Sequence, residues 1–182
     1  MPTTATKTSA KAAKKPAARK TASRAKSAPD AIDLLIADHK EVKGLFKDYE
    51  KLVKADAQSE EKQALALQIC AMLTAHATVE EELFYPEARS VLGDDEDLVD
   101  EADVEHASAK ELIAQIEAAS PDDDAHYDAK VKVLGEYIDH HVKEEEGEMF
   151  PKLRKSELDL DAIGEEIAAR KAELLGEDAE RH

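Results

Sequence analysis

The chain has 182 residues, which is enough for one domain with a buried core and a terminal extension. Its formal net charge is -17 at pH 7, but residues 1–29 contain eight Lys or Arg residues and no acid, so the rest is strongly acidic. That part should not bind nucleic acid or an anionic membrane by itself, and no apolar run approaches the roughly 20 residues of a transmembrane helix.

Residues 1–29 form a segment of low complexity, rich in Ala, Lys, Thr, Ser and Pro. Such a segment has too few large apolar side chains to offset the entropy lost on ordering, so we expect a disordered basic tail. Its charge fits a solubilising arm, weak contact with nucleic acid or another polyanion, or folding back onto the acidic part of the chain. A transit peptide is disfavoured because the segment has no apolar face.

The remaining sequence predicts helices, since Ala, Glu, Leu and Lys dominate and β-branched runs are nearly absent. The first helix begins at Asp30, which can cap it. Its apolar stripe contains Ile32, Leu35 and Val42 and also includes His39. We therefore expect this histidine to face the core.

A second helix follows Ser59, continues through Pro86, where we expect a kink, and stops near Gly93. His76 and Glu80 lie on its apolar stripe. This helix is therefore expected to bring both an imidazole and a carboxylate into the core.

The third helix begins at residues 94–95 and has His106 on its apolar face. A turn at residues 120–124 precedes the fourth helix, whose inward-facing positions include His141 and Glu145. Each of the first four helices thus has one histidine on its core face.

A fifth, amphipathic helix is predicted over residues 159–175. Short connections make sequence neighbours antiparallel, so the first four helices should form an up-down-up-down four-helix bundle with an additional C-terminal helix. The all-α chain is thereby divided into a disordered tail (1–29), a bundle domain (30–155) and a C-terminal helix and tail (156–182).

Two segments, 65 positions apart, repeat one motif: a His, a Glu four residues later, an aromatic residue at the ninth position and a Pro at the tenth. The four-residue spacing places the His and the Glu on one helical face. Two further histidines stand 37 and 35 residues before these motifs. The six candidate metal ligands are His39, His76, Glu80, His106, His141 and Glu145.

This residue set favours a metal site. One buried His is more often a hydrogen-bonded core residue, but burying two uncompensated carboxylates would cost several kcal/mol each, and a cation supplies the missing charge. Nitrogen and oxygen ligands without a thiolate suit iron first, with zinc or manganese as alternatives. Six ligands exceed one tetrahedral zinc site and suit two ions bridged by Glu80 and Glu145, with room for a small exogenous ligand.

These motifs resemble the hemerythrin-like HHE cation-binding domains, over about residues 30–155. The resemblance rests on Asp38-His39, His76-x3-Glu80 with Phe84-Tyr85-Pro86, Glu105-His106, and His141-x3-Glu145 with Phe150-Pro151. It implies a non-haem di-iron site in a four-helix bundle, in which the four histidines are terminal ligands and the two glutamates bridge the ions.

The chain departs from the oxygen carriers of this family at two positions. Those proteins have a further His four residues after the third-helix His, where this chain has Lys110, and an Asp five residues after the last His, where it has Glu146. Fewer imidazoles and more carboxylates should favour the oxidised metal and count against reversible dioxygen carriage. Lys110 is either a solvated helix residue or a hydrogen-bond donor to a bound oxygen species.

The other acids of the two motifs are expected on solvated helix faces. They are Glu81, Glu82, Glu144 and Glu146. For Glu81 and Glu146 the alternative is a role as a ligand or as an acceptor from a His N–H group. His140 adjoins His141, but the register to Pro151 selects His141 as the ligand.

Cys70 is expected in the core rather than as a redox sensor. As the only cysteine it excludes an intramolecular disulfide and fits a reducing compartment, and with no apolar signal segment we expect a cytoplasmic protein. Tyr49, Tyr85 and Tyr137 are expected to pack, with the alternative that one of them donates a hydrogen bond near the ligands.

We therefore expect a non-haem di-iron protein that binds or senses dioxygen or a related small molecule, or handles iron, rather than an enzyme. One alternative is a di-iron peroxidase or oxidase, although no Glu-x-x-His pair fits the site and His-Glu-x-x-His is absent. Another is a regulatory protein that the basic tail tethers to nucleic acid. The pattern leaves the oligomeric state open.

Overall fold

The structure, a computed structural model, describes residues 28–179 of the chain. The predicted basic tail lies outside these residues, except for its last two positions. Within residues 28–179 every regular element is helical, which confirms the all-α fold class. None of these helices is long and apolar enough to cross a membrane.

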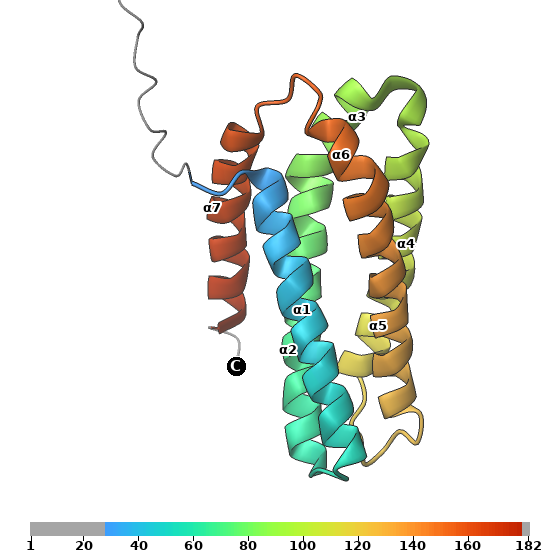
Figure 1. Ribbon diagram of the computed structural model, residues 1–182. Helices are drawn as coiled ribbons and strands as arrows, with labels where there is room; N and C mark the ends of the chain where they lie inside the picture. The colour runs from blue at the N-terminus through green and yellow to red at the C-terminus, as the bar shows by residue number, and fades with distance from the viewer. Residues whose placement is uncertain (1–27, 180–182) are drawn as a thin grey trace, which may run out of the picture.

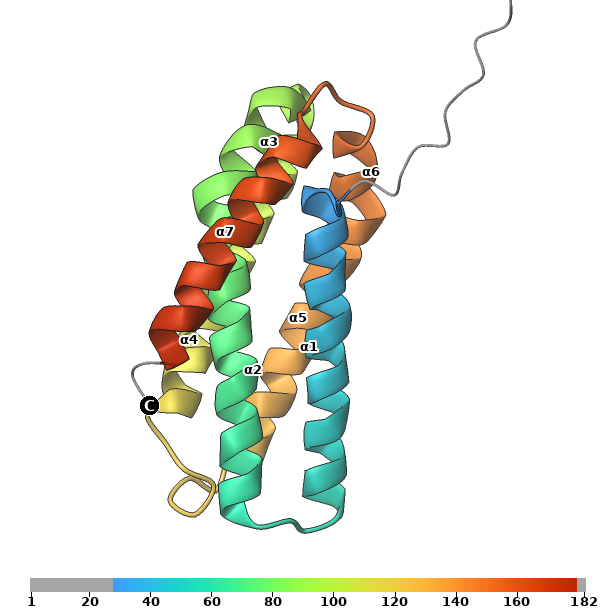
Figure 2. The same cartoon turned by 90° about the vertical axis from the view of Figure 1, so that its left-hand side faces the viewer.

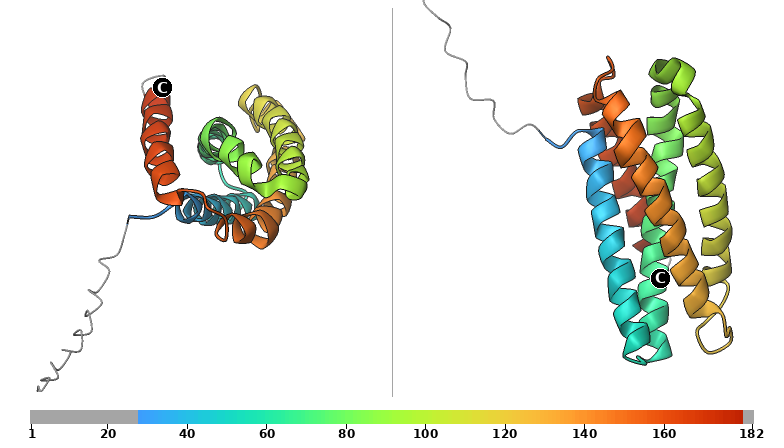
Figure 3. Two further views of the ribbon diagram at one scale, coloured as in Figure 1. Left: turned by 90° about the horizontal axis from the view of Figure 1, so that it is seen from above. Right: turned by 45° about the vertical axis from the view of Figure 1, so that its right-hand side comes forward.

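Four long helices make up most of this part of the chain: α1 (Ala31–Lys54), α2 (Ser59–Val79), α4 (Asp97–Glu117) and α5 (Tyr127–Glu144). They lie side by side, and each runs opposite to the one before it (Figures 1 and 2). Helix α1 contacts α2 and α5, and α4 contacts the same two helices, so the four enclose a common core. The left view of Figure 3 shows this arrangement from above.

The remaining elements of the described chain are three turns and three further helices. They are the π-helical turns η1 (Glu80–Phe84) and η3 (Glu145–Met149), the 3-10 turn η2 (Gly93–Asp95), and the helices α3 (Tyr85–Leu92), α6 (Phe150–Leu153) and α7 (Leu160–Ala179). Helix α7 lies outside the ring of long helices and packs against α1 and α2 (Figure 2).

The kink expected at Pro86 takes the form of a π turn just before it. The Tyr85 N–H donates to the Glu80 carbonyl, and the Phe150 N–H donates to the Glu145 carbonyl. A proline has no N–H for the usual bond to the residue four back, and a wider turn accommodates its ring. Because a π turn brings residue i+5 beneath residue i, each aromatic residue falls on the same face as the glutamate five positions earlier.

A polar layer divides the core into two apolar clusters. One cluster includes Ile32, Leu35 and Phe84, and the other includes Val42 and Ile69. On α1, α2 and α4 the buried histidine lies between apolar residues of the two clusters, whereas the buried apolar residues of α5 all belong to the second cluster and the first cluster resumes at Met149. The polar layer consists of His39, His76, Glu80, His106, His141 and Glu145.

Helix α7 is attached to the capped start of α1. As predicted, Asp30 caps α1, accepting a hydrogen bond of 2.9 Å from the Asp33 N–H. Ile163 and Ile167 of α7 are buried in the first apolar cluster, as the amphipathic pattern predicts. Gly164, between them, faces the α1 backbone directly, so the two helices approach closely at this point.

Replacing Gly164 with alanine should loosen this attachment. A Cβ atom there would lie 2.8 Å from the Ala31 backbone nitrogen and 3.0 Å from the Asp30 carbonyl carbon. We expect urea unfolding to show that the free energy of unfolding falls by roughly 1–3 kcal/mol. Gly44→Ala is the control, because nothing lies within 4 Å of its added Cβ, and it should gain up to about 1 kcal/mol in helix propensity. An unchanged stability of the Gly164 variant would contradict the close packing.

Candidate metal centre

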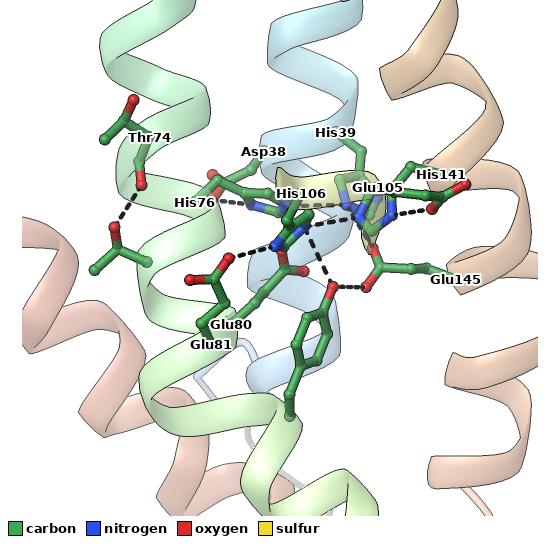
Figure 4. A network of polar contacts seen from close by, with 12 residues as sticks. Asp38, His39, Thr74, His76, Glu80, Glu81, Glu105, His106, His141 and Glu145 are labelled. Carbon is green, nitrogen blue, oxygen red and sulfur yellow. Dashed lines mark hydrogen bonds and ion pairs between the residues drawn. The ribbon is translucent and has the colours of Figure 1, made fainter. Parts of the chain in front are cut away.

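The six residues of the polar layer converge in the middle of the four long helices (Figure 4). Each long helix supplies one histidine, and the two glutamates are the first residues of the π turns η1 and η3. All six residues are buried, none more than 6% exposed. The structure therefore brings together all six residues that the sequence motifs predict as metal ligands.

Each glutamate lies between two histidines from different helices. Glu80 Oε2 is 3.2 Å from His76 Nε2 and 3.4 Å from His106 Nε2. In the same pattern, Glu145 Oε2 is 3.2 Å from Nε2 of the α1 histidine and 3.4 Å from Nε2 of the α5 histidine. The side chains form two potential ligand groups, and within each group the ligand atoms lie within 4.8 Å of one another. The first group is His39, His76, Glu80 and Glu145; the second is Glu80, His106 and His141, so the two groups share Glu80.

The histidines also approach one another in pairs. The Nε2 atoms of His39 and His76 are 3.2 Å apart, and so are those of His106 and His141. Each pair joins two helices that are neighbours in the chain. The pairing matches the internal repeat, because the α1–α2 hairpin and the α4–α5 hairpin contribute equivalent halves.

Four carboxylates outside the polar layer accept from the other ring nitrogen of each histidine. The Nδ1 distances are 2.9 Å for His39 to Glu146, 3.3 Å for His76 to Asp38, 3.0 Å for His106 to Glu81 and 2.9 Å for His141 to Glu105. We call these acids the backing carboxylates. With each Nδ1–H donating outward, each Nε2 faces inward, and its lone pair can bind a metal when the ring is neutral.

The carboxylates of the polar layer are poorly satisfied by the protein alone. Both side-chain oxygens of Glu80 and Oε2 of Glu145 are buried without a hydrogen-bond partner. Leaving buried charged groups unpaired costs several kcal/mol. Four inward-facing Nε2 atoms and two carboxylates thus surround a space that favours positive charge, so the donor set fits metal cations.

The protonation states of the protein without metal follow from burial. Burial, and then the charge of Glu145, raise the pKa of Glu80 well above its ordinary value. Burial also acts to raise the pKa of Glu145, but the neighbouring His141, His39 and His76 outweigh it and lower that pKa to about 2. Without metal, therefore, Glu145 ionises first, and Glu80 keeps its proton to a higher pH than an ordinary glutamate does.

His106 stays neutral, because burial, followed by the charge of His141, lowers its pKa to about 4. Burial likewise lowers the pKa of His76. Since metals bind the neutral imidazole, these two rings do not have to lose a proton near neutral pH before they coordinate.

Tyr85 is the tyrosine that reaches the polar layer. Its hydroxyl donates to Glu145 Oε1 at 3.0 Å and lies 3.4 Å from His106 Nε2. Burial, and then the charge of Glu145, raise its pKa well above the ordinary value, so it remains a phenol. Tyr85 is therefore the tyrosine that donates a hydrogen bond near the candidate ligands, which was the alternative to simple packing. The hydroxyl of Tyr49 instead donates to Asp128 at 2.7 Å.

Lys110 does not point into the polar layer. Its ammonium lies 2.7 Å and 2.5 Å from the two oxygens of Glu81, which in turn accepts from His106. Glu81 therefore holds the ammonium in this structure, but Lys110 also lines the small cavity beside the polar layer, so its role as a donor to a bound oxygen species stays a prediction. Glu81 is not simply solvated, since it takes the alternative role of acceptor from a His N–H group.

Two backing carboxylates, Asp38 and Glu105, were not assigned a role from the sequence. Each directly precedes a candidate ligand, but it backs the histidine of the next helix rather than its neighbour. His140, which the register argument rejected as a ligand, has a 65% exposed side chain near Glu105 and Glu144, outside the polar layer.

A small cavity of about 20 Å³ adjoins the polar layer. That volume is enough for about one water-sized molecule. All four histidines contribute to its wall, and the rest is mainly apolar. The apolar wall residues are Val42, Met72, Leu73, Ala77, Ala109, Ile113, Ile138 and Val142.

The model of the hemerythrin HHE cation-binding domain matches residues 30–153. The chain belongs to this family. The match confirms the resemblance that the sequence motifs indicate, and with it a domain whose His and Glu groups can bind metal cations.

Two individual proteins are similar to this HHE protein. A curated relative from Nostoc sp. (strain PCC 7120), a DNA nickase, is 34% identical over 129 residues, covering 68% of this chain but 33% of that protein. The chain thus spans about a third of the length of this relative. A crystal structure of an HHE domain-containing protein from Mycobacterium kansasii has a TM-score of 0.65 and 23% identity, over 81% of this chain and 88% of that one, and shows the same fold.

Proposed function

We propose that this HHE protein is a non-haem di-iron protein that binds or senses dioxygen or a related small molecule, or handles iron. In this proposal α1, α2, α4 and α5 act as an up-down-up-down bundle around the metal pair. His39 and His76 would hold one ion and His106 and His141 the other. Glu80 and Glu145 would bridge them, as their positions between histidines of different helices suggest.

One observation supports the proposal most strongly: four buried imidazoles direct their Nε2 atoms at two carboxylates that have unsatisfied oxygens. Nitrogen and oxygen donors without a thiolate suit iron, and also zinc or manganese. Bound iron would supply a redox-active Lewis acid with room for a small ligand. The mostly apolar wall of the adjoining cavity limits water, and its size selects a ligand of very few atoms.

A di-iron peroxidase or oxidase is the alternative use of the same centre. The observation in its favour is Tyr85, whose hydroxyl proton is held at Glu145 Oε1, directly beside the proposed ligands. A phenol in that place can donate a hydrogen bond to a substrate or pass a proton.

The visible absorption spectrum of anaerobically iron-loaded protein, before and after air is admitted, tests the proposal. A band that appears with air and disappears when oxygen is removed would support a carrier or sensor. A band that persists would favour oxidase, peroxidase or iron-handling chemistry. A purified protein that retains fewer than two ions per chain after loading would contradict the di-iron centre itself.

A nucleic-acid role is a second candidate, favoured by the DNA nickase relative and by the eight basic residues in residues 1–29. In this view the tail tethers the acidic domain to DNA, and binding should weaken steeply with salt. The test compares DNA binding and supercoiled-plasmid nicking by the wild type with a full-length variant whose tail Lys and Arg residues are all Gln. Equal binding by both proteins would exclude the tail as the tether.

A further inference from the structure

Two of the four backing carboxylates are themselves held by lysines. Lys171 of α7 binds Oδ1 of Asp38, whose Oδ2 lies 3.3 Å from His76 Nδ1. In the other half of the repeat, Lys110 of α4 binds both oxygens of Glu81, whose Oε1 lies 3.0 Å from His106 Nδ1. The two chains of contact have the same order: lysine, carboxylate, histidine.

The other two backing carboxylates lack such support. Among the residues that the structure describes, neither Glu146 nor Glu105 pairs with a Lys or Arg. Each of the two potential ligand groups therefore contains one histidine whose carboxylate is fixed by a lysine and one whose carboxylate is not. The asymmetry occurs once in each half, so it follows the internal repeat.

Lys171 comes from a helix that lies beyond the matched family domain, which ends at residue 153. The side chain of Asp38 is only 8% exposed, so the ammonium of Lys171 provides a charged partner that solvent cannot readily replace. The neighbouring Arg170 makes a different contact, with the more exposed Glu82 at 2.8 Å. Of these two adjacent cations, Lys171 thus contacts a backing carboxylate of a candidate ligand, whereas Arg170 contacts Glu82, which is not a backing carboxylate.

We infer that Lys171 is a positioning residue for the metal centre, because it holds Asp38 in the orientation that aims His76 Nε2 at Glu80. Lys110 is its counterpart and positions His106 through Glu81. The inference rests on the metal centre proposed above. It makes α7 part of that centre, although this helix supplies no ligand, and it gives each ion one lysine-supported histidine.

The experiment is chelator-driven release of two Zn²⁺ ions from the full-length protein, followed in time. Lys171→Met should speed the release of one ion about tenfold and leave the other unchanged, since the loss of an outer partner weakens metal affinity by 10–100-fold. Lys110→Met should do the same, and the double variant should speed both phases, because the lysines act on different ions. Arg170→Met is the matched control and should release both ions at the wild-type rate.

Two further variants separate positioning from a general loosening of α7. Lys171→Arg keeps the positive charge, so it should release Zn²⁺ at nearly the slow wild-type rate. In an Asp38→Asn background, Lys171→Met should have no additional effect, because the lysine acts through Asp38. Equal acceleration by Arg170→Met, or a further loss in the Asp38 variant, would overturn the inference.

The outcomes also distinguish this inference from the proposed function. A wild-type chain that holds fewer than two ions would refute the metal centre, and the role of the lysines with it. Two ions in the wild type together with unchanged release from Lys171→Met would refute the positioning role alone.

Discussion

Replacing Glu80 with alanine should remove both metal ions rather than one. Its Oε2 atom lies within 3.4 Å of histidines in both halves of the site, and Glu80 belongs to both potential ligand groups. Losing a shared carboxylate should weaken binding by more than the roughly 10–100-fold expected for an outer partner. Metal analysis after desalting should therefore fall from two ions per chain to nearly none.

The matched control is Glu82→Ala, two residues along the same π turn. Glu82 has a 44% exposed side chain and pairs with Arg170, so this variant should keep both ions. His76→Ala is informative as well, since this residue belongs to only one ligand group and its loss should affect one ion first. Stoichiometric metal in Glu80→Ala would refute the bridging role.

The candidate ligands could be found from the sequence because their signal is local. A His and a Glu four positions apart share a helical face wherever the helix lies, and the repeat of this motif selects the same residues twice. His39 and His106 have no such partner, but they interrupt apolar stripes, which places them in the core. Local periodicity therefore predicted both the helical fold and the polar layer.

The surroundings of the ligands could not be predicted in this way, because they depend on contacts between helices. Asp38 adjoins His39 in the chain but accepts from His76, and its other oxygen binds Lys171, which is 133 residues away. No short-range pattern indicates such a contact. The π turn is an intermediate case: the proline and the aromatic residue of the motif were visible, but the wider turn that brings Tyr85 inward was expected only as a kink.

Replacing Glu80 with methionine should have opposite effects on stability with and without metal. In chelator-treated protein, an apolar side chain of similar volume removes two unsatisfied buried oxygens, and such replacements are neutral or stabilise by about 1–4 kcal/mol. In metal-loaded protein, the wild type gains about 4 kcal/mol per ion at a free metal concentration 1,000 times the Kd, and the variant loses that gain. Urea unfolding with and without chelator measures both effects.

The stability of the two metal-free proteins should also depend differently on pH, which gives a second test of the buried Glu80 carboxyl group. The pKa of Glu80 is raised in the folded state above its ordinary 4.5. The stability that its proton contributes is therefore fully present below pH 4.5 and is lost as the pH rises through the raised pKa. Relative to Glu80→Met, the free energy of unfolding of the wild type should fall by at most about 1.4 kcal/mol per pH unit above pH 5.

The measurement is the difference in unfolding free energy between the two proteins, from urea unfolding at pH 5, 6 and 7 with chelator present. It reports on Glu80 together with Glu145, whose charge acts on it. The difference should widen as the pH rises. Parallel curves would mean that Glu80 has an ordinary pKa in the folded chain, and hence that its carboxyl group is solvated or paired without a metal. The reason for expecting a cation between the histidines would then be removed, whatever metal the protein retains on purification.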